Sequence, residues 1–350
     1  MSTDLKVLTK KDFQSDQEVR WCPGCGDYAI LSAVQTVFPE LGIPREKIVV
    51  VSGIGCSSRF PYYMETYGLH SIHGRAPAVA TGLKVSRPDL DVWIATGDGD
   101  AMSIGGNHLI HLLRRNVGVK VLMFNNRIYG LTKGQYSPTS ELGKRTKSTP
   151  VGSVDPPFNP LSLAIGAGAT FVARTVDIYV QHLRETLRQA AAFEGTAFVE
   201  IYQNCNIFND KAFAYMTEKD VRDEQTVYLE HGKPVTYGKD SQRGIRMSGT
   251  RLESFAIGEE GDESDCLVWD AEQANPAMAF MMAQMGPPDF PTPVGILRSV
   301  ETPTYEESVV GQIQHAVEKG GQGTLESLIY SGEIWTVGED GAIVSDGSSG

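Results

Sequence analysis

Short apolar runs alternate with segments of helical periodicity along roughly the first 200 residues. The apolar runs lie at 47–56, 91–100, 119–126, 169–176 and 195–204. Before and between them, apolar residues recur at spacings of three and four, which predicts helices over 27–40, 75–86, 105–116, 160–167 and 177–192. Strands that alternate with helices in this way predict an α/β fold with an open, mostly parallel sheet flanked by helices.

Polar and sulfur-containing residues follow several of these predicted strands. Cys56, Asp98, Asn126 and Cys205 each come at the end of a different apolar run. Ligands of open parallel sheets bind at the carboxyl ends of the strands. We therefore expect these four loops to meet at a single site.

The amino-acid composition of the sequence changes after about residue 230. Residues 253–273 contain eight acidic residues and no Lys or Arg, and residues 286–304 are rich in Pro and Thr. Acidic, Pro-rich segments bury little apolar surface. We therefore predict a domain over residues 1–230. Residues 231–350 are expected to form an irregular extension that contacts another subunit or is partly disordered.

Charge and hydropathy exclude some partners. The chain has 31 Lys and Arg against 43 Asp and Glu, a net charge of −12, which argues against nucleic acid as a partner. No apolar run approaches the roughly 18 residues that a membrane span needs. The polar N-terminal segment lacks the apolar core of a signal peptide. We expect a cytoplasmic protein without a membrane partner.

The stretch "WCPGCG" at 21–26 contains two of the five cysteines. A Cys-x-x-Cys pair can be a redox dithiol, half a zinc site or half an iron–sulfur site. Pro23, Gly24 and Gly26 allow the loop to aim both thiols at one point. Cys22, Cys25, Cys56 and Cys205 all fall in predicted loops, which indicates a metal or a cluster, and their spacing leaves zinc and iron–sulfur open.

The stretch "GDGDAMSIGGNHL" at 97–109, followed by "FNNRIYG" at 124–130, indicates a magnesium diphosphate site. Mg²⁺ prefers hard oxygen ligands, which the Asp98 carboxylate and the Asn126 amide oxygen supply from two strand ends. Gly97 and Gly99 allow the backbone to approach phosphate oxygens. The combination resembles the thiamine diphosphate motif of thiamine-dependent enzymes.

Six stretches in order resemble the β subunits of 2-oxoacid:ferredoxin oxidoreductases. The resemblance covers about residues 18–215 and is carried by "WCPGCGDY", "GIGCSSR", "HGRAPAVATGLK", "GDGDAMSIGGNHL", "NNRIYGLTKGQ" and "CNIFND". It implies a thiamine diphosphate-binding fold and one 4Fe–4S cluster ligated by Cys22, Cys25, Cys56 and Cys205. Iron–sulfur is preferred over zinc because a redox-inert metal has no task beside thiamine. Cys266 matches no part of the motif.

The resemblance also implies which residues contact the cofactors. The implied thiamine diphosphate contacts are Ile54, Gly55, Cys56, Ser57, His73, Gly97, Asp98, Gly99, Asp100, Asn126, Gly130 and Leu131. The implied Mg²⁺ ligands are Asp98, Asn126 and the backbone oxygen of Ile128. His73, near the diphosphate in related proteins, is one of two residues to which we assign a catalytic role.

Lys133 is the second residue to which we assign a catalytic role, and our prediction of the substrate depends on it. It lies just past the Mg²⁺ loop, where a cation can pair with the distal carboxylate of 2-oxoglutarate. The resemblance then implies CoA-dependent formation of succinyl-CoA and CO₂, with electrons passed to ferredoxin. It also implies an α subunit that completes the thiamine site. The alternatives are a pyruvate-specific or broad-range 2-oxoacid enzyme, a non-redox thiamine decarboxylase subunit, and a zinc-stapled binding protein.

Overall fold

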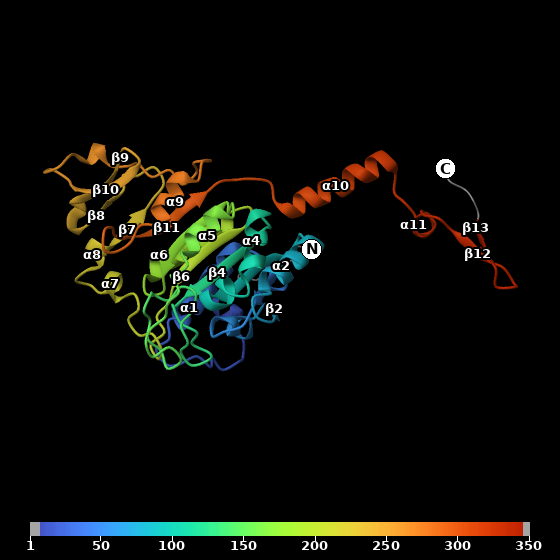
Figure 1. The fold of residues 1–350 in the computed structure, drawn as a ribbon, viewed down its shortest axis with the longest axis horizontal. Helices are drawn as coiled ribbons and strands as arrows, with labels where there is room; N and C mark the ends of the chain where they lie inside the picture. Colours follow the sequence, from blue (N-terminus) through green and yellow to red (C-terminus); the bar gives the residue numbers. More distant parts are fainter. Residues whose placement is uncertain (1–7, 346–350) are drawn as a thin grey trace. The chain divides into compact units, whose positions relative to one another are not determined.

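The computed structural model describes residues 8–345, and its centre is an eleven-stranded sheet within that range (Figure 1). Six neighbouring strands are parallel; in order across the sheet they are β5 (Phe171–Val176), β6 (Ala197–Tyr202), β4 (Val119–Asn125), β3 (Asp91–Gly97), β1 (Ile48–Ser52) and β2 (Tyr67–His70). The predicted α/β fold with an open, mostly parallel sheet is confirmed. β2 is the one strand of this set that the apolar pattern did not predict.

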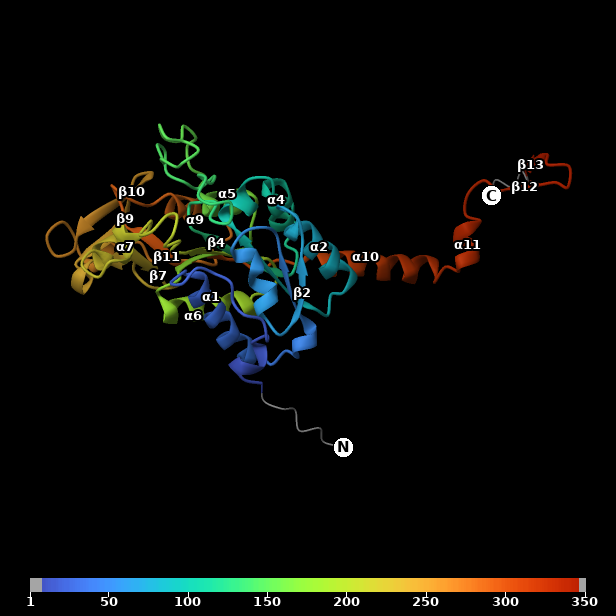
Figure 2. The ribbon, with the colours of Figure 1, turned by 90° about the horizontal axis from the view of Figure 1, so that it is seen from below.

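Helices cover both faces of the parallel strands (Figures 1 and 2). One face packs against α1 (Asp27–Val37) and α6 (Val180–Ala192), and the other against α2 (Ala76–Ser86), α4 (Gly106–Arg114), α5 (Pro160–Gly166) and α9 (Ala277–Ala283). The helix predicted over 27–40 ends as a 3₁₀ turn, Phe38–Leu41. α5 begins at Pro160 because the Asn159 side chain caps it, accepting a hydrogen bond from the Ser162 N–H at 3.1 Å.

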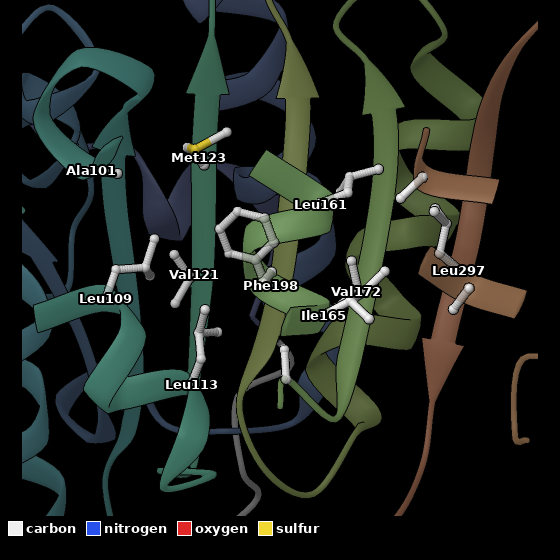
Figure 3. Close-up of a cluster of buried hydrophobic side chains, with 14 of the residues drawn as sticks. Ala101, Leu109, Leu113, Val121, Met123, Leu161, Ile165, Val172, Phe198 and Leu297 are labelled. Carbon is white, nitrogen blue, oxygen red and sulfur yellow. The ribbon is translucent and has the colours of Figure 1, made fainter. Parts of the chain in front are cut away.

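The central strands are mostly apolar because both of their faces are covered, and the charged residues Arg174 and Glu200 form a buried ion pair between β5 and β6. All seven residues of β4 are buried, as expected for a parallel strand between two helical layers. Figure 3 shows the cluster on the α4 and α5 side, where Val121, Phe198 and Val172 meet the helices. This packing fixes the strand ends, and therefore the loops that follow them.

Shorter helices lie between the strands and longer helices of residues 8–305. They are α3 (Asp98–Met102), α7 (Ala214–Thr217), α8 (Arg222–Gln225) and the 3₁₀ helices Lys10–Phe13, Phe38–Leu41, Arg45–Lys47, Ser57–Tyr63, Lys239–Ser241 and Glu263–Asp265.

The sheet continues beyond residue 230, where we predicted an irregular extension. The added strands, in order outward from β5, are β11 (Thr292–Ser299), β7 (Thr226–Leu229), β8 (Thr236–Tyr237), β9 (Arg243–Ser248) and β10 (Arg251–Ala256). β11 pairs antiparallel with β5 and parallel with β7. Part of the acidic segment is thus the edge strand of a hairpin, because β10 pairs with β9.

The chain divides into two compact units at Tyr305 rather than at residue 230. The second unit, from Glu306, contains all but the first residue of helix α10 (Tyr305–Gly320), helix α11 (Leu325–Ile329) and a small hairpin of β12 (Trp335–Val337) and β13 (Ile343–Ser345). The predicted boundary therefore lies about 75 residues too early, because composition obscured the strands β8 to β11 and helix α9 that follow residue 230.

Candidate functional site

The loops after β1, β2, β3 and β4 enclose a pocket of ≈ 60 Å³. It is lined by all the residues that we predicted to contact thiamine diphosphate or Mg²⁺: Ile54, Gly55, Cys56, Ser57, His73, Gly97, Asp98, Gly99, Asp100, Asn126, Ile128, Gly130 and Leu131. The sequence motifs, which are up to 77 positions apart, are thus brought together at the carboxyl ends of parallel strands. We call this the diphosphate pocket.

Asp98 supplies a buried carboxylate to this pocket. It is 2% exposed, and its Oδ2 accepts hydrogen bonds from Ser137 Oγ at 2.5 Å and Thr139 Oγ1 at 2.6 Å. Burial raises the pKa of Asp98, while these hydroxyls act in the opposite direction. In the described part of the chain no Lys or Arg forms an ion pair with it. A buried carboxylate without a cationic partner fits a site for Mg²⁺.

Asn126 and Ile128 lie side by side at the end of β4. Asn126 Oδ1 accepts a hydrogen bond from the Ile128 N–H at 3.2 Å, which fixes the orientation of the amide. The Ile128 side chain is buried, so its backbone is the part that can serve the pocket. Both positions suit the predicted metal site.

Asp100, a predicted cofactor contact, lines the diphosphate pocket and also joins neighbouring segments of the chain. Its Oδ1 accepts hydrogen bonds from the Ile54 N–H at 3.1 Å and the Gly74 N–H at 2.8 Å, and its Oδ2 accepts one from Thr96 Oγ1 at 2.9 Å. Both carboxylate oxygens are therefore used in joining the loops after β1 and β2 to β3. Asp100 lines the pocket and shapes it.

His73 is an exposed residue on the wall of the diphosphate pocket. Its backbone carbonyl accepts a hydrogen bond from Arg75 Nη1 at 3.0 Å, and the same guanidinium nitrogen contacts the Ile104 carbonyl at 3.4 Å. Arg75 therefore ties this loop to the loop after α3.

All four predicted cluster ligands line a second cavity, of ≈ 260 Å³. Cys205 is buried, Cys25 and Cys56 are half-buried, and Cys22 is exposed. Cys266 is not among the lining residues; it packs against Gly244 of β9. Within residues 8–345, no three His, Cys, Asp or Glu side chains are arranged to hold a single metal ion. What the four cysteines share is a cavity, which we call the cysteine cavity.

The electrostatics of this cavity favour a positively charged occupant. Burial, with Asp27 as the next cause, raises the pKa of Cys56 to about 12 and also raises the pKa of Cys25. Thiols in such surroundings become thiolates when a metal centre supplies positive charge. A Cβ built on Gly130 would lie 3.6 Å from both Cys56 Sγ and Cys205 Sγ, so glycine keeps the space between these sulfurs open. The residues present fit an iron–sulfur cluster.

The diphosphate pocket and the cysteine cavity share one wall. Cys56, Asn126, Gly130 and Leu131 line both. Lys133 lines the cysteine cavity, is exposed, and has a φ of 75°, an unusual conformation for a residue other than glycine. Its side chain is therefore displayed beside the shared wall, and no ion pair holds it in the described chain.

Sequence reasoning missed several residues of the site. Tyr129 lines the diphosphate pocket and its hydroxyl donates to the Gly99 carbonyl at 3.1 Å; Ser137 and Thr139 hold Asp98. Gln203 lies between the two sites, with bonds to both. Gln203 directly follows β6 and precedes Cys205 by two residues, a position that could have marked it.

Comparisons with known proteins agree with this geometry. The family model described as "Thiamine pyrophosphate enzyme, C-terminal TPP binding domain" matches residues 53–201. The 2-oxoglutarate oxidoreductase subunit KorB of Mycobacterium tuberculosis is 54% identical over 330 residues, which is 93% of this chain and 88% of that protein. The chain belongs to the β subunits of the 2-oxoacid:ferredoxin oxidoreductases. The predicted family, oxidoreductase class and thiamine diphosphate-binding fold are confirmed.

Other β subunits of this family are similar over different lengths. Subunit beta of 2-oxoacid:ferredoxin oxidoreductase 1 from Aeropyrum pernix is 49% identical over 190 residues, 54% of this chain and 60% of that protein. A solved structure, 2-oxoglutarate:ferredoxin oxidoreductase from Magnetococcus marinus with 2-oxoglutarate, coenzyme A and succinyl-CoA bound, matches with a TM-score of 0.73 and 33% identity. The match covers 94% of this β subunit and 97% of that chain. None of the helices in residues 8–345 is both long and apolar enough to cross a membrane.

Proposed function

We propose that this β subunit, together with an α subunit, catalyses the CoA-dependent oxidative decarboxylation of 2-oxoglutarate to succinyl-CoA and CO₂, with ferredoxin as the electron acceptor. The observation that supports this most directly is the wall shared by the diphosphate pocket and the cysteine cavity. Carbon chemistry and electron transfer take place at neighbouring sites in such an enzyme. A non-redox decarboxylase or a zinc-stapled binding protein would not need the two sites to adjoin.

Each absent group has a set of residues suited to hold it. Asp98 and Asn126, with the backbone of Ile128, would hold Mg²⁺, and the Gly97–Gly99 loop would lie against the diphosphate. Cys22, Cys25, Cys56 and Cys205 would hold one 4Fe–4S cluster. When bound, thiamine diphosphate supplies the nucleophilic carbon and electron sink for decarboxylation, and the cluster accepts single electrons. His73, an exposed residue that lines the pocket, would contact the diphosphate.

Lys133 would recognise the distal carboxylate of 2-oxoglutarate. It is displayed beside the shared wall without an ion pair in the described chain. The solved relative that contains 2-oxoglutarate supports this choice of substrate. A broader 2-oxoacid or pyruvate specificity is the second candidate, because the relatives from Aeropyrum pernix and Saccharolobus solfataricus are named for 2-oxoacids in general.

The α subunit would cover the open side of the diphosphate pocket and complete the thiamine site. The relatives are themselves named as subunits of larger enzymes, which supports a partner of this kind. We further propose a cytoplasmic location, where the substrate, CoA and ferredoxin are available.

The test is the reduction of ferredoxin by the β subunit co-purified anaerobically with its α subunit, with CoA and either 2-oxoglutarate or pyruvate. A charge-assisted hydrogen bond contributes roughly 1.5–3 kcal/mol, so Lys133→Ala should lower kcat/KM for 2-oxoglutarate about 10- to 100-fold. The value for pyruvate should change less than about threefold, on the same reasoning. Lys147→Ala, an exposed loop lysine outside both sites, is the matched control and should behave as the wild type.

Four outcomes would contradict parts of the proposal. Preference for pyruvate in the wild type would refute the assignment of the substrate, and an unchanged preference in Lys133→Ala would refute the role of Lys133. A colourless protein containing zinc but no iron or acid-labile sulfide would refute the cluster. Decarboxylation without ferredoxin reduction would favour the non-redox decarboxylase.

A further inference from the structure

The side chain of Gln203 connects the diphosphate pocket to the cysteine cavity. Asn126 Nδ2 donates a hydrogen bond to Gln203 Oε1 at 2.8 Å. Gln203 Nε2 in turn contacts Cys25 Sγ at 3.3 Å. A single amide therefore joins a proposed Mg²⁺ ligand to a proposed cluster ligand.

Backbone groups fix the orientation of the two side-chain amides, Asn126 and Gln203, in this series of hydrogen bonds. The Ile128 N–H donates to Asn126 Oδ1 at 3.2 Å, which turns Asn126 Nδ2 towards Gln203. The second N–H of Gln203 Nε2 donates to the Asn204 carbonyl at 2.6 Å, which turns Oε1 towards Asn126. With both of its N–H donors used, Gln203 has one complete arrangement, in which it donates to the sulfur.

Gln203 is held rigidly in this position. It is 1% exposed, and its backbone N–H donates to the Asn125 carbonyl at 2.9 Å. The cysteine loop, residues 21–26, packs directly on it: a Cβ built on Gly26 would lie 3.0 Å from Gln203 Cγ, and the Gly26 N–H donates to the Asn204 carbonyl at 3.1 Å. A buried amide with so little room to move transmits a change at one end to the other.

We propose that Gln203 is a positioning residue that couples occupancy of the magnesium–thiamine diphosphate site to the reduction potential of the cluster. An N–H donor to a ligating sulfur stabilises the more negative, reduced form and so raises the potential. A cation at Asn126 Oδ1 would polarise the Asn126 amide and so strengthen the hydrogen bond from Asn126 Nδ2 to Gln203 Oε1. This in turn would polarise the Gln203 amide and strengthen the hydrogen bond from Gln203 Nε2 to Cys25 Sγ. Cofactor binding therefore raises the potential of the cluster, making it a better acceptor when thiamine diphosphate is present.

The coupling is reciprocal, because two linked equilibria must affect each other equally. Reduction of the cluster strengthens binding of magnesium–thiamine diphosphate by the same factor by which the cofactor favours reduction. This inference rests on the proposed cluster and Mg²⁺ sites.

The test is an EPR-monitored redox titration of the anaerobic complex of α and β subunits, with and without added Mg²⁺ and thiamine diphosphate. In the wild type, the cofactor should raise the midpoint potential. Gln203→Met keeps the length of the side chain but removes the donor. It should lower the ratio of reduced to oxidised cluster about tenfold at a fixed potential, as expected for the loss of a hydrogen bond to a charged acceptor. This corresponds to about 59 mV for a one-electron couple.

The variants should also differ in their response to the cofactor. Gln203→Met should lose most of the cofactor-induced shift, and its affinity for thiamine diphosphate should no longer depend on the oxidation state of the cluster. Gln203→Glu, which can accept from Asn126 but cannot donate to the sulfur when ionised, should have a still lower midpoint. Asn206→Leu is the matched control. Asn206 also lines the cysteine cavity, but its Nδ2 donates to the Pro23 carbonyl at 2.7 Å, so it is not part of the hydrogen-bond chain from Asn126 to Cys25.

The outcomes separate this inference from the proposed function. Wild-type midpoints and an intact cofactor-induced shift in Gln203→Met would overturn the inference while leaving the cluster in place. If Gln203→Met assembles no cluster, the same comparison is made with Gln203→Glu, whose unchanged midpoint would have the same meaning. Absence of iron and sulfide from the wild type would refute the proposed function, and the inference with it.

Discussion

Gly99 is the position in the diphosphate pocket where a single added methyl group is most informative. A Cβ built on Gly99 would lie 2.2 Å from Cε1, 2.6 Å from Cδ1 and 2.8 Å from Cζ of the Tyr129 ring. The Tyr129 hydroxyl also donates to the Gly99 carbonyl at 3.1 Å. Gly99→Ala therefore forces the ring away and breaks this hydrogen bond.

Three contributions determine the cost of Gly99→Ala. Overpacking a well-filled site costs roughly 1–3 kcal/mol, and loss of the hydrogen bond adds about 1 kcal/mol. Gly99 lies within α3, so replacing glycine by alanine returns about 0.5–1 kcal/mol of backbone entropy. We expect the free energy of unfolding to fall by about 1–3 kcal/mol, with weaker binding of thiamine diphosphate because Tyr129 lines its pocket.

Urea unfolding of the purified chain measures the first effect and titration with thiamine diphosphate the second. The matched control is Gly82→Ala, in the interior of α2 with no atom within 4 Å of the added Cβ, which should stabilise the protein by about 0.5–1 kcal/mol. In a Tyr129→Ala background, the penalty of Gly99→Ala should disappear because the obstructing ring is gone. The same penalty with and without the ring would refute the steric reasoning, as would equal effects of the substitutions at Gly99 and Gly82.

Two further predictions concern buried charge outside the site. Arg174→Met should destabilise the protein by about 3–5 kcal/mol, because Glu200 is fully buried and would lose its ion-pair partner at 2.7 Å. The double variant Arg174→Met with Glu200→Gln should unfold at a higher urea concentration than Arg174→Met alone, because no unpaired charge is left buried. The reverse order would contradict this explanation. Burial lowers the pKa of His182 to about 4, so the unfolded state binds more protons than the folded state between about pH 6.5 and pH 4. The free energy of unfolding should therefore fall by up to about 3 kcal/mol as the pH falls through this window. His182→Gln, which can still pair with Thr175 Oγ1, should show a shallower decline in urea unfolding, and identical declines in both proteins would contradict this origin.

The parallel half of the sheet could be predicted because its signals are local. β1, β3, β4, β5 and β6 are short, buried apolar runs, and a helical segment follows or precedes each one. The antiparallel part was missed for the opposite reason. β7, β8, β9 and β10 are four, two, six and six residues long and partly exposed, so neither a continuous apolar run nor a strict alternation marks them. Of these four strands, β7 pairs with β11, which lies more than 50 positions further along the chain, so its place in the sheet depends on tertiary contacts.

The same distinction explains what could be predicted of the candidate site. Asp98, Asn126 and the four cysteines lie at strand ends or within spaced motifs, and both of these signals survive in a linear sequence. Ser137 and Thr139 belong to a Pro-, Ser- and Thr-rich stretch that reads as a linker, yet folding brings their hydroxyls to the Asp98 carboxylate. Gln203 gains its position only when the end of β6 lies beside the end of β4 and the cysteine loop folds over both. Motifs therefore identify the atoms that would hold the cofactors, whereas the residues that orient these atoms and connect the two sites become visible only in the packed structure.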